Sequence, residues 1–120
     1  LCKTSRYCRK GMKHIKLCEE KHPETSRKFK EVLNEMYSTF CKKQLDYGPA
    51  NIMIGGNIED DEDRKLALLG IWIRSNDKME RIKNLMKTND AHNESIEDSY
   101  LDLANYSIIS LIVRSKLWGK

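Results

Sequence analysis

The fold is decided by residues 93–118, which read NESIEDSYLDLANYSIISLIVRSKLW. The apolar side chains of this stretch cover almost the full circumference of a helix; they are Ile96, Tyr100, Leu101, Leu103, Ala104, Ile108, Ile109, Leu111 and Ile112. A helix that is apolar on nearly all sides is typical of a buried position. We therefore predict a central, buried helix, which begins after the polar segment 88–93 with its cap-forming Asn and Asp residues.

Three acids stand out against this apolar background. Glu94, Asp98 and Asp102 follow each other at i, i+4 and i+8, which predicts one shared face, with Glu97 to one side. Like charges one turn apart repel, and a buried carboxylate needs a divalent cation, basic side chains of a neighbouring helix, or protonation. Carboxylate oxygens suit Mg²⁺ or Mn²⁺. The three aligned acids are therefore candidate catalytic residues, and together with Glu97 they are candidate metal ligands.

A second helix is predicted over residues 64–87. Its apolar positions form one stripe: Leu68, Ile71, Trp72, Met79, Ile82 and Met86. Along its flank lie four charged side chains, namely Arg74, Asp77, Lys78 and Arg81. These cations could pair with the three acids in an interhelical salt-bridge network, which the pattern weights equally with a metal site at the acids. Taken by itself, the basic patch could hold phosphate oxygens, or it could be a solvated edge. The pattern gives the two interpretations equal weight.

A third helix is predicted over residues 25–45, on the spacing of Phe29, Val32, Leu33, Met36, Tyr37, Phe40 and Cys41. Pro23 lies near its start, and Gly48 with Pro49 follows its end. The next stretch, residues 47–63, breaks the periodicity and is expected to be a long loop. The acids at residues 59–63 are interpreted as helix-capping residues rather than metal ligands, since they precede the next helix.

Composition agrees with an all-α protein. The 120 residues include 39% hydrophobic and 33% charged residues, with only two prolines and six glycines. We predict one small helical bundle of three to four helices, completed by dimerisation or by residues 12–22. The apolar runs fall short of the roughly 20 residues that a membrane span needs, and no secretory signal is legible. A cytoplasmic location is expected.

The first 45 residues are basic, with twelve Lys or Arg against five Glu. Binding of nucleic acid by this region is not favoured, because only Tyr7 could stack on bases in its most basic part. Residues 1–23 are predicted to be a basic N-terminal segment, of which residues 1–11 have no role in the fold.

Cysteine and histidine also gather in the first part of the chain. Free thiols are the expected state of Cys2, Cys8, Cys18 and Cys41, since a secretory signal is missing. A zinc site at Cys8, His14, Cys18 and His22 is not favoured, because their spacing contains no CxxC pair.

Three phrases carry a resemblance to a known family: KKQLDYGPANI (42–52), GIWIRSNDKMERIKNL (70–85) and ESIEDSYLDLANYSII (94–109). They resemble the bacterial and phage family called nucleotide modification associated domain 1. The resemblance implies a helical domain over residues 24–120 with a role in nucleotide metabolism. It also implies a location in the host cytoplasm if the protein is phage-encoded.

The chain is also distantly similar to the all-α nucleotide pyrophosphohydrolases of the MazG and dimeric dUTPase type. Those enzymes hold Mg²⁺ with an EExxE motif and an ExxD motif in a four-helix bundle. Here Glu31 and Glu35 keep only the i, i+4 part of the first motif, and Glu94 and Asp98 are spaced by four residues rather than three.

The family resemblance implies five nucleotide-side residues around the DYG phrase: Lys43, Asp46, Tyr47, Gly48 and Asn51. Gly48 permits close approach of the backbone, Tyr47 offers a ring for stacking, and Asn51 can read a base or sugar edge. The alternative is a plain helix C-terminus with a tyrosine packed on it.

The predicted function is that of a metal-dependent nucleotide-binding or nucleotide phosphohydrolase-like domain. Its partner would be a nucleotide or deoxynucleotide, and Mg²⁺ or Mn²⁺ its cofactor. The alternative is a non-catalytic helical accessory module that binds nucleic acid or a protein partner.

Overall fold

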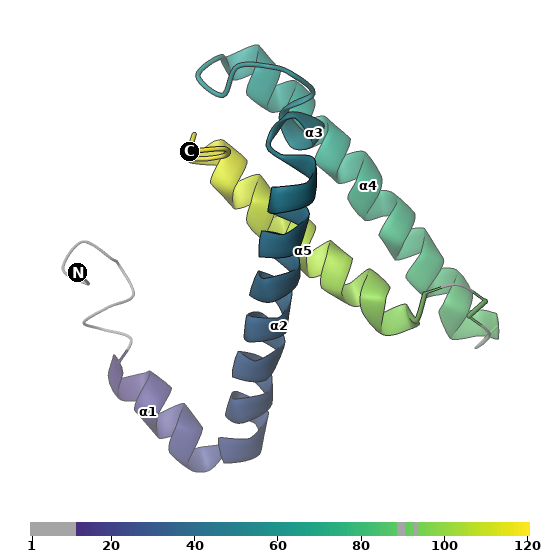
Figure 1. Cartoon of the computed structure of the whole chain (residues 1–120). Helices are drawn as coiled ribbons and strands as arrows, with labels where there is room; N and C mark the ends of the chain where they lie inside the picture. Colours follow the sequence, from purple (N-terminus) through teal and green to yellow (C-terminus); the bar gives the residue numbers. More distant parts are fainter. Residues whose placement is uncertain (1–11, 89–90, 93) are drawn as a thin grey trace. The chain divides into compact units, whose positions relative to one another are not determined.

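The computed structural model describes residues 12–88, 91–92 and 94–120. Within them the chain is all-α, as predicted, with five helices: α1 (Met12–Lys21), α2 (Pro23–Tyr47), α3 (Ala50–Met53), α4 (Asp61–Thr88) and α5 (Ile96–Arg114) (Figure 1). None of these helices is both long and apolar enough to cross a membrane. The expectations for residues 1–11, including Cys2 and Cys8, lie outside the described residues.

Two compact units divide the chain, Leu1–Ser38 and Thr39–Lys120. In the described part of the first unit, α1 is followed directly by the first turns of α2. Pro23 opens α2, where its missing N–H costs no helical hydrogen bond. An ion pair of 3.2 Å between Glu19 and Lys30 joins the two helices. Cys18 in this unit and Cys41 in the other are free thiols, as predicted.

The second unit is built on α4 and α5, which lie side by side and run in opposite directions (Figure 1). The last turns of α2, the short helix α3 and the residues after α5 complete this small bundle. Its core consists of Ile52, Met53, Ala67, Ile71, Ile109, Val113 and Trp118. All of them belong to residues 39–120, so this unit has a hydrophobic core of its own.

The segment between α2 and α4 is not a continuous loop, which corrects the prediction for residues 47–63. Gly48, at a positive φ of 68°, ends α2, and the single turn of α3 follows. Ile52 and Met53 of α3 are buried, because this turn lays its apolar residues on α4. The capping interpretation of the acidic run is confirmed, since the Asp60 carboxylate accepts a hydrogen bond of 2.9 Å from the backbone N–H of Asp63.

The buried stripe of α4 differs from the predicted one. Ile71 and Ile82 are buried as expected, but Ala67 and Leu85 complete the stripe. The predicted members Trp72, Met79 and Met86 are exposed. The buried face of α4 is therefore shifted from the predicted one, although Ile71 and Ile82 belong to both.

Helix α5 is less buried than its sequence predicts. Ser99, Ile109 and Val113 are its buried residues, whereas Leu111 is 67% exposed. The expectation of burial on nearly all sides is therefore wrong. In the described part of the second unit, α5 packs mainly on α4, and one neighbouring helix covers one face rather than the whole circumference.

The residues after α5 turn back onto the start of the unit. Lys116 has a positive φ of 64°, and the N–H of Leu117 donates to the carbonyl of Ile112 across 3.2 Å, which closes a Schellman-type helix end. This turn buries Trp118. Its ring meets Phe40 of α2 edge-on, with the ring centroids 6.0 Å apart.

Candidate functional site

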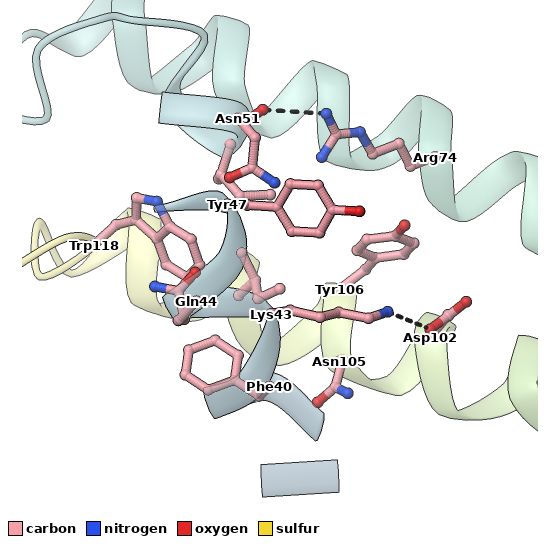
Figure 2. Close-up of a pocket in the computed structure, with 12 residues that line it drawn as sticks. Phe40, Lys43, Gln44, Tyr47, Asn51, Arg74, Asp102, Asn105, Tyr106 and Trp118 are labelled. Carbon is pink, nitrogen blue, oxygen red and sulfur yellow. Dashed lines mark hydrogen bonds and ion pairs between the residues drawn. The ribbon is translucent and has the colours of Figure 1, made fainter. Parts of the chain in front are cut away.

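A cavity of about 350 Å³ opens in the second unit, where the end of α2 meets α5 (Figure 2). Helix α2 lines it with Phe40, Lys43, Gln44 and Tyr47, and α5 lines it with Asp102, Asn105, Tyr106 and Ile109. Both sets follow the spacing i, i+3, i+4 and i+7, which places each set on one helix face. The remaining lining residues are Asn51, Ile52, Arg74 and Trp118. Five segments therefore build this pocket: α2, α3, α4, α5 and the turn after α5.

The pocket combines three kinds of side chain. Its aromatic rings are Phe40, Tyr47, Tyr106 and Trp118, its amides are Gln44, Asn51 and Asn105, and its charged groups are Lys43, Arg74 and Asp102. In Figure 2 the amino group of Lys43 lies at Asp102, whereas Trp118 and Gln44 lie on the opposite side of the pocket. Tyr106 lies beside the Lys43–Asp102 contact in the same view, so aromatic rings border the ionic part of the lining as well as the part around Trp118.

Asp102 lies between two lysines. Its side chain is only 18% exposed, and its two oxygens contact Lys78 Nζ at 2.9 Å and Lys43 Nζ at 3.3 Å. Burial raises the pKa of Asp102, but the hydrogen bond from Lys78 and the positive charges of both lysines outweigh burial and hold that pKa below its ordinary value of 3.8. The same hydrogen bond raises the pKa of Lys78 above 10.5. Asp102 is thus an ionised carboxylate between two ammonium groups.

Arg74 is oriented by the backbone of α3. Its Nη2 donates a hydrogen bond of 3.1 Å to the carbonyl oxygen of Asn51 (Figure 2). A guanidinium carries five N–H donors, so one such bond orients the group without exhausting it. Arg74 and Lys43 are the two cations that line the pocket, and both were predicted as phosphate-binding residues.

The residues predicted to bind the nucleotide or its phosphate fall into three groups. Lys43, Tyr47, Asn51 and Arg74 line the pocket. Lys78 contacts it only through Asp102. Asp46, Gly48, Asp77 and Arg81 do not line it.

Arg81 instead holds the start of α5. Its guanidinium donates to Ser99 Oγ at 2.6 Å, to the carbonyl of Ser95 at 3.1 Å and to the carbonyl of Glu94. Ser99 of α5 is fully buried, and its hydrogen-bond partner Arg81 belongs to the neighbouring helix α4. Arg81 therefore joins α4 to the start of α5 by hydrogen bonds and does not line the pocket.

The predicted line of buried acids does not form. Ser95 caps α5 by accepting from the N–H of Asp98, so the helix begins at Ile96 and Glu94 precedes it. Glu94, Glu97 and Asp98 are exposed, and only Asp102 is part of the pocket. The expectation of a buried ladder is therefore wrong, because the helix begins two residues after Glu94 and its first turn, with Glu97 and Asp98, is exposed.

The positions of these acids also concern the predicted Mg²⁺ or Mn²⁺ ion. Among residues 12–88, 91–92 and 94–120, no three His, Cys, Asp or Glu side chains gather where they could hold a metal ion. Both oxygens of Asp102 contact lysine ammonium groups. The four acids in this arrangement do not fit a shared Mg²⁺ or Mn²⁺ site, and the metal stays a prediction from residue type.

Several pocket residues were not predicted. Asn105, Tyr106 and Ile109 stand three, four and seven residues after Asp102, so helical spacing from that acid could have found them. On α2, Phe40 stands three residues before Lys43, and Gln44 stands three residues before Tyr47. Trp118 had no such signal, because only the turn after α5 brings it to the pocket.

The chain matches one known family model. Residues 43–113, more than half of the chain, match the family model described as nucleotide modification associated domain 1. The chain belongs to this family. The matched region contains every lining residue of the pocket except Phe40 and Trp118.

No curated protein and no solved structure matches the chain. The nucleotide modification associated domain 1 family is therefore the one relationship that these comparisons show. The more distant similarity to MazG-type enzymes stays a prediction.

Proposed function

We propose that the pocket between α2 and α5 is a nucleotide-binding site. The observation that supports this proposal is the combination of four aromatic rings with the cations Lys43 and Arg74 in one cavity, most of whose lining residues belong to the family's matched region. Bases stack on aromatic rings, and phosphate oxygens accept charge-assisted hydrogen bonds from Lys and Arg. An amphipathic pocket of this kind therefore suits a ligand with one flat apolar part and one anionic part.

Each kind of side chain has a role in this proposal. The aromatic rings, Trp118 among them, offer stacking surface for the base. The amides of Gln44, Asn51 and Asn105 can both donate and accept hydrogen bonds, as recognition of base or sugar edges requires. Arg74, oriented by Asn51, and Lys43 would hold the phosphate.

Binding can be followed through the protein's own fluorescence. The chain has two tryptophans, Trp72 and Trp118. Trp72 is exposed on α4 and does not line the pocket, so Trp72→Phe leaves Trp118 as a reporter inside it. Titration of this variant with the four deoxynucleoside monophosphates and triphosphates should change the Trp118 emission, with a Kd below about 1 mM. Calorimetry on the unchanged chain provides an independent Kd.

Two neighbouring lysines supply a matched control. Lys43 lines the pocket, whereas Lys42 is exposed and does not. Lys43→Met should weaken binding about tenfold or more, because a charge-assisted hydrogen bond to phosphate is lost. Lys42→Met removes the same charge and should leave the Kd within about twofold. Equal losses in both variants, or no binding by the unchanged chain to any nucleotide, would refute the proposal.

Hydrolysis of the nucleotide with Mg²⁺ or Mn²⁺ is the finer part of the proposal. It rests on residue type at Glu94, Glu97, Asp98 and Asp102 and on the family's link to nucleotides, and it is tested separately from binding because these acids do not gather into one metal site in the described residues. Each nucleotide is incubated with the protein in EDTA, in Mg²⁺ and in Mn²⁺, and products are separated by ion-exchange chromatography. Binding without product in every condition would favour the non-catalytic accessory module over an enzyme.

Self-association is a further part of the proposal. Leu69 and Trp72 of α4 and Leu111 of α5 expose more than half of their surface, although all three are large and apolar. Apolar side chains exposed in this number are typical of interaction surfaces. We expect a homo-oligomer in sedimentation-velocity experiments, and a sedimentation coefficient of one chain at all concentrations would contradict this expectation.

A further inference from the structure

The charges at the pocket define which phosphate ligand it suits. Two of the lining residues are cations, Lys43 and Arg74, and one is an anion, Asp102. A third cation, Lys78, neutralises Asp102 from outside the lining across 2.9 Å. Three positive charges and one negative charge are therefore placed together, and two positive charges are left for a ligand.

A phosphate monoester matches this excess. It carries a charge of about −1.5 to −2 near pH 7. A triphosphate carries more negative charge than the pocket can balance, and such ligands usually bring Mg²⁺ with them. Among the residues that the structure describes, the acids do not gather into a metal site, and the one acid in the pocket is already paired with lysine.

From these observations we infer that the pocket takes a nucleoside monophosphate without a metal ion, with Lys43 moving from Asp102 to the ligand's phosphate. This inference rests on the proposed nucleotide-binding function and adds the ligand class and the role of Asp102. Asp102 is a positioning residue: it holds the Lys43 amino group inside the pocket and competes with the phosphate for it.

The geometry supports this role of Asp102. Lys43 contacts its oxygen Oδ1 at 3.3 Å, the longer of the two ion pairs, and the Lys43 side chain is 56% exposed. Lys78 contacts Oδ2 at 2.9 Å, and its side chain is only 24% exposed. The Lys43 contact is therefore the weaker and more solvent-accessible pair. When Lys43 leaves, Lys78 still neutralises the half-buried carboxylate.

Two substitutions outside the phosphate contacts test the inference, and their expected effects have opposite signs. Asp102→Asn removes the competitor and should tighten binding of a nucleoside monophosphate in EDTA by about threefold or more. Lys78→Met leaves Lys43 as the main cation at Asp102 and should weaken the same binding by a similar factor. A metal ligand at Asp102 predicts the reverse for both variants: Asp102→Asn would weaken Mg²⁺-dependent binding, and Lys78→Met would strengthen it.

The ligand panel separates the possible ligands. It contains deoxynucleoside monophosphates, triphosphates, nucleosides and inorganic phosphate, each with EDTA and with Mg²⁺, measured by calorimetry on the full chain. We expect monophosphates to bind in EDTA about tenfold or more tightly than nucleosides and free phosphate, because each of these lacks one half of the ligand. Equal binding of free phosphate and monophosphates would overturn the inference.

Failure of the inference differs from failure of the proposed function. Binding of triphosphates only with Mg²⁺, weakened by Asp102→Asn, would overturn the inference and leave nucleotide binding intact. No binding of any nucleotide under any condition would overturn both. Circular dichroism of Asp102→Asn confirms that it folds; if it does not, Lys78→Met alone decides, because only the inference expects it to weaken binding in EDTA.

Discussion

The indole Nε1 of Trp118 donates a hydrogen bond to the carbonyl oxygen of Pro49 across 3.0 Å. The two residues lie 69 positions apart, and this bond ties the turn after α5 to the turn between α2 and α3. The same indole packs in the core and lines the pocket. The Trp118 side chain therefore contributes both to the stability of the second unit and to the shape of the pocket.

Replacement of Trp118 should cost stability in two steps. Trp118→Phe keeps a ring but loses the hydrogen bond to Pro49, with an expected loss of about 1–2 kcal/mol in the free energy of unfolding. Trp118→Ala also opens a cavity and should lose about 3–5 kcal/mol. Urea unfolding followed by circular dichroism measures both. The control is Trp72→Phe, which changes an exposed ring and should cost less than about 0.5 kcal/mol; equal losses in Trp72→Phe and Trp118→Phe would contradict the assignment.

The ion pair of Asp102 with Lys78 should contribute measurably to stability. Lys78→Met removes the closer cation of a half-buried carboxylate and should lower the free energy of unfolding by about 1–2 kcal/mol at pH 7. Lys83→Met, at an exposed position of the same helix, is the control and should change it by less than about 0.5 kcal/mol. Indistinguishable values for the two variants would show that the pair contributes nothing.

The pH dependence of this pair follows from the two pKa shifts. The pKa of Asp102 lies below 3.8 in the folded protein, so its contribution is present above that pH and is lost as the pH falls further. The pKa of Lys78 lies above 10.5, so its contribution is present below that pH and is lost as the pH rises through the shifted value. The stability difference between the unchanged chain and Lys78→Met should therefore be constant from about pH 5 to 9. A difference that changes steeply near neutrality would contradict these shifts.

Arg81 should behave as a structural residue and not as a phosphate ligand. Arg81→Lys loses the planar fork that bonds Ser99 and the backbone before α5, and should lower stability by about 2 kcal/mol. The Kd for nucleotides should change by less than about threefold at a temperature where the variant is folded. Thermal unfolding and calorimetry measure the two effects. If Arg81→Lys is stable but no longer binds nucleotides, Arg81 is a phosphate-binding residue, as the basic patch of the sequence suggested.

The helix end at Lys116 offers a stabilising substitution. A residue with a side chain pays about 1–2 kcal/mol for the left-handed conformation that Lys116 adopts, and glycine does not. Lys116→Gly should therefore raise the free energy of unfolding by about 1 kcal/mol. Arg114→Gly, two residues earlier inside α5, should instead lower it by about 1 kcal/mol. Destabilisation by both glycines would argue against the Schellman-type end.

Much of the fold and part of the pocket could be predicted from sequence. The spacing of apolar residues predicted α2, α4 and α5, because the period of a helix is a local property. The capping role of the acids before α4 is local in the same sense, since Asp60 and Asp63 contact within one turn. Lys43, Tyr47, Asn51 and Arg74 were predicted and do line the pocket.

The sequence by itself determined the three long helices α2, α4 and α5 and the residue types that they present, whereas α3 was missed. Tertiary structure decided which of those residues meet: Lys43 reaches Asp102 across 59 positions, Arg81 turns to α5, and Trp118 folds back to Pro49. It also left Glu94 and Asp98 exposed, whereas Asp102 is largely buried between two lysines. The physical reason is range: helical periodicity and capping act within a few residues, whereas the partner of a charge depends on how separate helices pack and on which residue caps each helix.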